Sequence, residues 1–161
     1  MNRIKNVFAR LLVALLPERL RRRLIRNHIE RLRQALEGTL TDKFLEILLG
    51  VMSVAFVLLG SYRRNIRGFE GTYLFRTADG RVAAGAHFKK GFMQILTKEP
   101  PAYHVAVTFN DPAALRRYLF SRDQDILASI LANDVTVDGN LNYIYKFGFL
   151  ARDLVRRLGV A

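Results

Sequence analysis

Residues 134–155 read DVTVDGNLNYIYKFGFLARDLV, a stretch in which a short strand leads through a turn into a long helix. The β-branched tripeptide 135–137 favours a strand, and the Asp-Gly pair after it is typical of a turn. A helix then begins near Asn140 and is closed by Gly159, because glycine is a common residue at the end of a helix. The stretch therefore predicts a strand over 135–137 and a C-terminal helix over 140–158.

The segment before this stretch reads as several short strands followed by two short helices. Its apolar and polar side chains alternate with a period of two, and Ala78-Asp79-Gly80 is a hairpin turn signal. Pro112 follows the capping residue Asp111 and suits the first position of a helix. We predict strands over 69–77, 81–88, 91–97 and 102–109, and helices over 111–120 and 123–133.

An uncharged run, ILLGVMSVAFVLLG, occupies residues 47–60 and forms the centre of a predicted helix over 41–59. As a helix, this run is about 21 Å long, which is shorter than the roughly 30 Å hydrocarbon layer of a bilayer. A membrane span is therefore possible but not favoured. A helix that is apolar on all sides is more often buried on both sides within a protein.

The N-terminal segment is basic and amphipathic. The formal net charge of the chain is +12, and residues 1–36 alone carry +8. Two amphipathic helices are predicted, over 2–16 and 18–36, and we expect the segment to be retained because no signal-peptide cleavage site follows it. Such a segment indicates anionic lipid headgroups; nucleic acid is less favoured because residues 19–33 lack aromatic side chains. The predicted membrane-binding residues are Arg3, Lys5, Arg10, Arg19, Arg21, Arg22, Arg23 and Arg26.

No catalytic constellation is evident in the sequence. The chain has no Cys, which excludes thiolate metal sites and cysteine nucleophiles, and it carries none of the common nucleotide-binding or hydrolase motifs. His87 and His104 fall in predicted strands and could be neighbours in one sheet, where ordinary hydrogen bonds explain them better than metal binding does. Asp123 and Asp125 fit helix capping better than a carboxylate dyad. We therefore predict a non-enzymatic protein without metal or cofactor.

The apolar residues are the more informative ones. Strand residues 83–86 read AAGA and fill little volume, whereas helix 41–59 offers large side chains such as Phe44 and Met52. Small residues on a sheet permit either close packing of a helix or an unfilled cavity. The residues by themselves leave both alternatives open.

Three segments carry a resemblance to a known family: YHVAVTFNDPAALRRYLFSRD (103–123), DQDILASILANDVTVDGN (123–140) and LNYIYKFGFLARDLV (141–155). Together they resemble the C-terminal half of the sterol carrier protein 2 (SCP2) domain, in which a short strand of pattern V-x-V-x-G-(D/N) precedes a final helix. Here that signature is Val135 to Asn140. The resemblance covers roughly residues 44–158.

The resemblance implies an α+β fold with a five-stranded, mainly antiparallel sheet, helices over one face and an apolar tunnel between them. It also implies non-enzymatic binding of an apolar lipid, such as a fatty acyl chain, an isoprenoid quinone precursor or a sterol-like molecule. Bacterial members of the family include accessory factors of ubiquinone synthesis. The implied pocket is lined by Phe44, Leu48, Met52, Phe56, Phe75, Phe88, Phe92, Ile126, Ile130, Tyr143 and Phe147.

Two domains are thus predicted: a basic helical extension over 1–38 and an SCP2-like lipid-binding domain over 39–161. We expect the protein to be cytoplasmic and to bind or transfer an apolar lipid at the inner face of the membrane. The alternative is a structural or assembly protein that uses the apolar helices as an oligomer or partner interface.

Overall fold

The computed structural model describes residues 17–36, 43–80, 83–111, 113–114, 117–118 and 126–159. The predicted helix 2–16 and half of the residues of the predicted helix 111–120 lie outside these ranges. The helices are α2 (Glu18–Leu36), α3 (Phe44–Leu58), α4 (Gly60–Arg63), the short 3-10 helix η2 (Arg64–Ile66), α6 (Ile126–Leu131) and α7 (Leu141–Leu158). The strands are β1 (Gly71–Thr77), β2 (Ala83–Lys89), β3 (Phe92–Leu96), β4 (Val105–Phe109) and β5 (Val135–Gly139).

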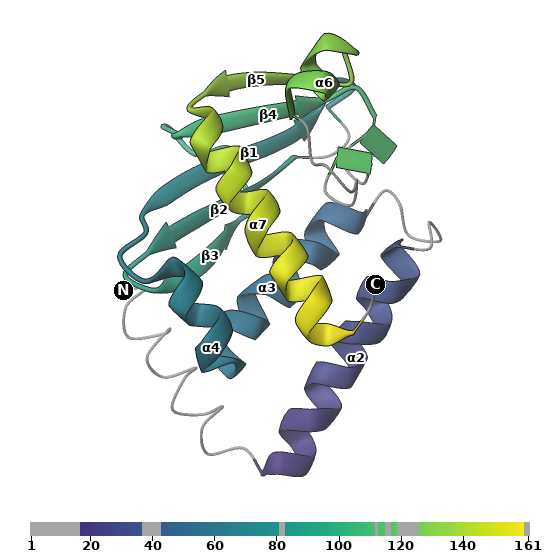
Figure 1. Cartoon of the computed structure of the whole chain (residues 1–161), viewed down its shortest axis with the longest axis vertical. Coiled ribbons are helices and arrows are strands. Elements are labelled where there is room, and N and C mark those ends of the chain that lie inside the picture. Colours follow the sequence, from purple (N-terminus) through teal and green to yellow (C-terminus); the bar gives the residue numbers. More distant parts are fainter. Residues whose placement is uncertain are drawn as a thin grey trace.

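The five strands form one sheet in the order β3-β2-β1-β4-β5. The pairs β1–β2, β2–β3 and β4–β5 are antiparallel, and only the central pair β1–β4 is parallel. The predicted α+β fold with a five-stranded, mainly antiparallel sheet is confirmed. Figure 1 shows α7 running diagonally across the strands with α3 beside it, so both helices cover the same face of the sheet, which we call the inner face.

The ends of α7 follow the rules that the sequence suggested. The Asn140 side chain accepts a hydrogen bond from the backbone N–H of Asn142, and Gly159 ends the helix in the left-handed conformation at φ 63°. Gly139, at φ 107°, passes so close to the backbone of His104 that a Cβ atom at this position would collide with its carbonyl oxygen. The glycine of the Val135–Asn140 signature is therefore required by the approach of β5 to β4.

A connection of eight residues, 97–104, crosses the other face of the sheet, which we call the outer face. It must cross because β3 and β4 run in the same direction with β2 and β1 between them. Two side-chain interactions attach the connection to the sheet. Glu99 forms an ion pair with Arg76 of β1 at 3.7 Å, and the Tyr103 hydroxyl donates to Asp138 of β5 at 2.7 Å. One face of the sheet is thus covered by helices and the other by this loop.

The long apolar helix that was predicted over 41–59 ends at Leu58, where the chain turns into α4. Its fully buried side chains gather on one face, which packs against α2, α7 and the sheet, while most residues of the opposite face are half-buried and Glu46 is exposed. No single helix in the described ranges is long and apolar enough to cross a bilayer. The segments Phe44–Leu58 and Gly60–Ile66 meet the length and composition criteria only as a pair, with a bend of 103° between them.

Candidate functional site

The space between the inner face and the helices is filled by aromatic and aliphatic side chains. The rings of Phe75 in β1 and Phe147 in α7 lie 4.6 Å apart, and those of Tyr73 and Phe88 lie 5.5 Å apart. All four side chains are almost completely buried. They form one continuous apolar layer with α3, and this layer is the candidate ligand site.

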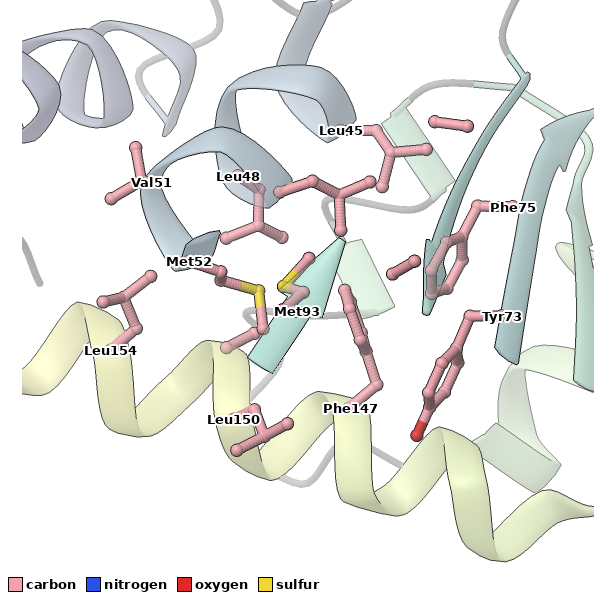
Figure 2. Close-up of a cluster of buried hydrophobic side chains, with 14 of the residues drawn as sticks. Leu45, Leu48, Val51, Met52, Tyr73, Phe75, Met93, Phe147, Leu150 and Leu154 are labelled. Atoms are coloured by element: carbon pink, nitrogen blue, oxygen red, sulfur yellow. The ribbon is translucent and has the colours of Figure 1, made fainter. Parts of the chain in front are cut away.

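The small residues of β2 let α3 approach the sheet. Ala84 and Ala86 face the helices and are buried, and α3 packs on β2 and β3. Of the two alternatives that the sequence left open, the structure has close packing at this strand. Figure 2 shows the side chains of Met52 and Met93 entering the layer between α3, α7 and the sheet. Methionine is unbranched and flexible, so this part of the layer can adapt its shape more easily than a layer of rings.

Ten of the eleven predicted pocket residues fall into three groups. Seven belong to the buried layer, two lie half-buried at its margin, and the side chain of Ile126 lies outside the described part of the chain. Phe92 is placed differently: it pairs with Lys89 and therefore shares the outer face with it, because directly opposed residues of an antiparallel pair point to the same side. The seven are Phe44, Leu48, Met52, Phe56, Phe75, Phe88 and Phe147, and the two are Ile130 and Tyr143.

Two buried tyrosine hydroxyls border the layer, and each donates to a backbone carbonyl of α7. The Tyr62 hydroxyl bonds the oxygen of Leu150 at 2.8 Å, and the Tyr73 hydroxyl bonds that of Tyr143 at 2.8 Å. Burial raises the pKa of Tyr73, and burial together with the nearby Asp153 carboxylate raises the pKa of Tyr62. Both groups therefore stay protonated and hold α7 against α4 and β1.

Asp153 joins α7 to the turn after α4. Its carboxylate accepts hydrogen bonds from Arg157 at 2.7 Å, Arg156 at 2.9 Å and Asn65 at 2.7 Å, and only 4% of the side chain is exposed. Burial alone would raise the pKa of Asp153, but the hydrogen bonds from the two arginines and Asn65 outweigh it and lower the pKa. Arg157 also donates to Ser61 at 3.0 Å, so the cluster fixes α4 to α7.

His87 of β2 and His104, the last residue of the crossing connection, meet at Thr72 of β1. The Thr72 backbone N–H donates to Nδ1 of His104 at 3.0 Å, and its hydroxyl lies 2.9 Å from Nδ1 of His87. The His104 ring also stacks on Tyr143 at 5.0 Å between centroids. Of the two predicted strand positions, His87 does lie in β2, whereas His104 lies one residue before β4; the ordinary hydrogen bonds that were predicted are present, and both are made to Thr72 of the intervening strand β1. Within the described ranges there is no group of three or more His, Asp or Glu side chains that could hold a metal ion.

The predicted membrane-binding residues are only partly within the described chain. Arg19, Arg23 and Arg26 lie exposed on α2. The side chains of Arg21 and Arg22, and the whole of Arg3, Lys5 and Arg10, lie outside the described residues. On the same helix Leu32 is fully buried, and α2 packs beside α3. The amphipathic character that was predicted for 18–36 is thus present among the described side chains of α2.

The described residues also form grooves on the surface beside the helices that cover the apolar layer. One, of about 510 Å³, lies between α2 and α3 and is lined by residues that include His28, Arg31, Glu46 and Gly50. The other, of about 430 Å³, is lined by Gly60, Arg63, Arg64, Arg67, Gly68, Lys90 and Gly91, and we call it the basic groove. Sequence reasoning missed the basic groove because Lys90 is more than twenty residues from the arginines in the chain, although the spacing of Arg63, Arg64 and Arg67 was visible.

No protein-family model matches the sequence, and no curated protein matches it. Among solved structures, a double mutant of the sec-alkyl sulfatase PisA1 aligns with a TM-score of 0.51 at 16% identity, over 65% of this chain and 15% of the sulfatase. The parent enzyme, the stereoselective inverting sec-alkylsulfatase Pisa1 from Pseudomonas sp., aligns with a TM-score of 0.48 at 20% identity. That alignment covers 61% of this chain but only 16% of the enzyme.

A third solved structure is the UbiJ-SCP2 ubiquinone synthesis protein, with a TM-score of 0.49 at 17% identity, over 67% of this chain and 95% of that protein. At these identities, likeness is a matter of fold alone. The fold itself, however, has two features that the resemblance implied: a five-stranded, mainly antiparallel sheet and helices over one face. The described chain therefore has an SCP2-like fold, and the helix α2 precedes α3 and the sheet.

Proposed function

We propose that the chain binds an apolar, lipid-like molecule in the layer between the inner face and helices α3 and α7, without catalysing a reaction. The observation that carries this proposal is the continuous layer of buried aromatic, methionine and leucine side chains between the sheet and two helices. In this proposal residues 39–161 are the lipid-binding domain and residues 1–38 are a basic extension. A fatty acyl chain, an isoprenoid quinone precursor or a sterol-like molecule would suit such a layer.

The entry of a ligand requires side chains to move, because the layer is closely packed. Met52 and Met93 are the flexible members of the layer, and rotation of their side chains is the least costly way to open it. Each Å² of apolar ligand surface that is removed from water contributes about 25 cal/mol, which offsets the cost of moving these side chains. The polar groups that border the layer already donate to backbone carbonyls, so the proposal assigns them to structure and not to catalysis.

The membrane part of the proposal rests on the basic helix α2. Arg19, Arg23 and Arg26 are exposed, and each Lys or Arg near an anionic bilayer contributes about 1 kcal/mol. The protein would then exchange its ligand with the cytoplasmic face of the membrane. Flotation with vesicles tests this part: recovery with anionic vesicles should exceed recovery with neutral ones at low ionic strength. Equal recovery would contradict electrostatic docking.

Ligand binding is tested with a fluorescent fatty acid and two matched variants of the full chain. Ala86→Val adds two methyl groups on the inner face, and Ala106→Val adds the same two groups at a buried position of the outer face. We expect the first variant to weaken probe binding by about tenfold, because the added volume competes with the ligand, whereas the second retains the affinity of the parent. Equal affinity in all three proteins would contradict the proposed site.

The same preparation can be extracted with organic solvent and the extract analysed by mass spectrometry. A co-purified apolar molecule in stoichiometric amount would support the proposal directly and would identify the ligand. An empty extract together with no binding of the fluorescent probe would refute it.

A specific observation favours the second candidate, an interface for a protein partner or a second copy. Tyr145 and Phe149 lie one turn apart on α7 with 46% and 47% of their surface exposed. Aromatic side chains are enriched in interfaces. Native mass spectrometry separates the two functions, since a lipid adduct on a monomer supports the carrier and a dimer without adduct supports the interface.

A further inference from the structure

The basic groove unites two segments that are distant in the chain. Arg63, Arg64 and Arg67 come from α4, η2 and the turn after it, whereas Lys90 comes from the turn between β2 and β3. Among the residues that the structure describes, no acidic side chain lines the groove. Gly60, Gly68 and Gly91 form the rest of its described wall, so the large side chains recorded there are all cationic.

The four cations of the groove are not neutralised by carboxylates. In the part of the chain that the structure describes, none of them forms an ion pair, although other arginines such as Arg117 and Arg157 do. Arg63 is half-buried and directs one nitrogen toward the carbonyl oxygen of Phe56 at 3.4 Å, whereas Arg64, Arg67 and Lys90 are exposed. A concentration of like charge in a concave site attracts anions, because no carboxylate of the described residues balances these cations.

The groove also adjoins the apolar layer on both sides. Phe69 follows Gly68 directly in the chain, and its ring contacts those of Phe88 and Tyr143, each at 5.6 Å between centroids. On the other wall, Lys90 lies two residues after Phe88, whose side chain is fully buried in the layer. An anion in the groove is therefore next to the aromatic edge of the proposed ligand site.

We infer that the basic groove binds the phosphate-type headgroup of an amphiphile whose apolar chain enters the layer beside Phe69. This inference rests on the proposed function and narrows the ligand to a class: a single long apolar chain that ends in a phosphate or diphosphate. Arginine suits this headgroup because its planar guanidinium donates in a fork to phosphate oxygens. Arg64, Arg67 and Lys90 hold the headgroup, and Arg63, held in part by Phe56, borders the passage to the layer.

The test uses three probes on the full chain: hexadecyl phosphate, hexadecanol and inorganic phosphate, each titrated at low ionic strength. We expect hexadecyl phosphate to bind at least about tenfold more tightly than hexadecanol, since each exposed cation near an anionic headgroup contributes roughly fivefold. This preference should shrink as salt is added. Inorganic phosphate, which lacks the apolar chain, should bind far more weakly than hexadecyl phosphate.

A groove variant and a control variant make the test specific. The groove variant carries Arg64→Gln, Arg67→Gln and Lys90→Asn, with Asn chosen because Lys90 has a positive φ of 53° that Asn tolerates. The control carries Arg31→Gln, Arg33→Gln and Lys98→Asn, which remove the same charge at exposed positions outside the groove and outside the predicted membrane-binding set. We expect the groove variant to bind both long-chain probes equally, whereas the control keeps the preference of the parent.

The outcomes separate this inference from the proposed function. If hexadecanol and hexadecyl phosphate bind the parent equally well, the headgroup site is overturned while the apolar site stands. If neither long-chain probe binds, the proposed function itself fails. If inorganic phosphate binds as tightly as hexadecyl phosphate, or if the control variant loses the preference as fully as the groove variant, the amphiphile site is overturned.

Discussion

The two faces of the sheet are both covered, but they are covered by different means. The inner face presents Tyr73, Phe75 and Phe88 to two helices, and the contacts there are almost all apolar. The outer face presents Thr72 and Arg76, among others, to the crossing loop 97–104, which is held by hydrogen bonds and an ion pair.

Under the proposed function, this difference separates the face that accepts a ligand from the face that holds the crossing loop. Apolar contacts are non-directional, so side chains on the inner face can be replaced by a lipid chain without leaving polar groups unsatisfied. Hydrogen bonds on the outer face have fixed partners, and each would have to be broken to admit a molecule. Variants of the two faces test whether the faces also differ in how much they contribute to the free energy of unfolding.

The largest effect should come from removing a ring of the inner layer. We expect Phe147→Ala to lower the free energy of unfolding by about 3–5 kcal/mol, because it leaves a cavity between α7 and the sheet. Phe149→Ala is the matched control: it removes the same ring from the same helix at an exposed position and should cost less than about 1 kcal/mol. Urea denaturation of both variants measures the difference. Equal losses would break the distinction between a packed layer and a solvent-facing surface.

A smaller loss of unfolding free energy is expected at the Asp153 cluster, which joins α7 to α4. Asp153→Asn should lower the free energy of unfolding by about 1–3 kcal/mol at neutral pH, since it removes the charge that three donors share. The folded state lowers the pKa of Asp153, so its contribution is complete above about pH 4, the usual pKa of an unfolded Asp, and is lost as the pH falls through the lower folded value.

Denaturation midpoints of the parent and of Asp153→Asn, measured over a series of pH values, check this sign. The two curves should be separated at neutral pH and should converge in acid. A separation that stays constant into strongly acidic solution would show that the charge of Asp153 is not what stabilises the contact between α4 and α7.

The next effect concerns a single buried hydrogen bond. Tyr62→Phe removes the hydroxyl that donates to the Leu150 oxygen while retaining the ring that stacks on Phe56 at 4.4 Å. We expect a loss of about 1 kcal/mol in unfolding free energy, typical of one neutral hydrogen bond. A loss as large as that of Phe147→Ala would mean that this bond, and not apolar packing, dominates the helical layer.

The smallest effect is expected on the outer face. Tyr103→Phe removes the bond to Asp138, but both partners are exposed and water replaces the bond readily. We expect the urea midpoint of this variant to match that of the parent within error. A clear shift to lower urea would show that the crossing loop stabilises the fold more than its exposure indicates.

Most secondary structure was predictable because it depends on local patterns. The strand and helix around the Val135–Asn140 signature, the hairpin at Ala78–Gly80 and the burial of helix 41–59 all follow from spacing, turn residues and the absence of charge. Phe92 shows where such reasoning failed. Lys90 and Gly91, both at positive φ, form a two-residue turn, and this turn sets Phe92 opposite Lys89 on the outer face.

The sequence by itself determined the elements, the apolar character of the inner layer and the basic character of the N-terminal segment, because these are properties of neighbours in the chain. Only the tertiary structure decided which face each strand residue occupies, which residues meet at Thr72 and Asp153, and that Lys90 joins Arg63, Arg64 and Arg67 in one groove. The physical reason is that strand register and helix placement bring together residues far apart in the sequence, and local sequence patterns do not predict such contacts.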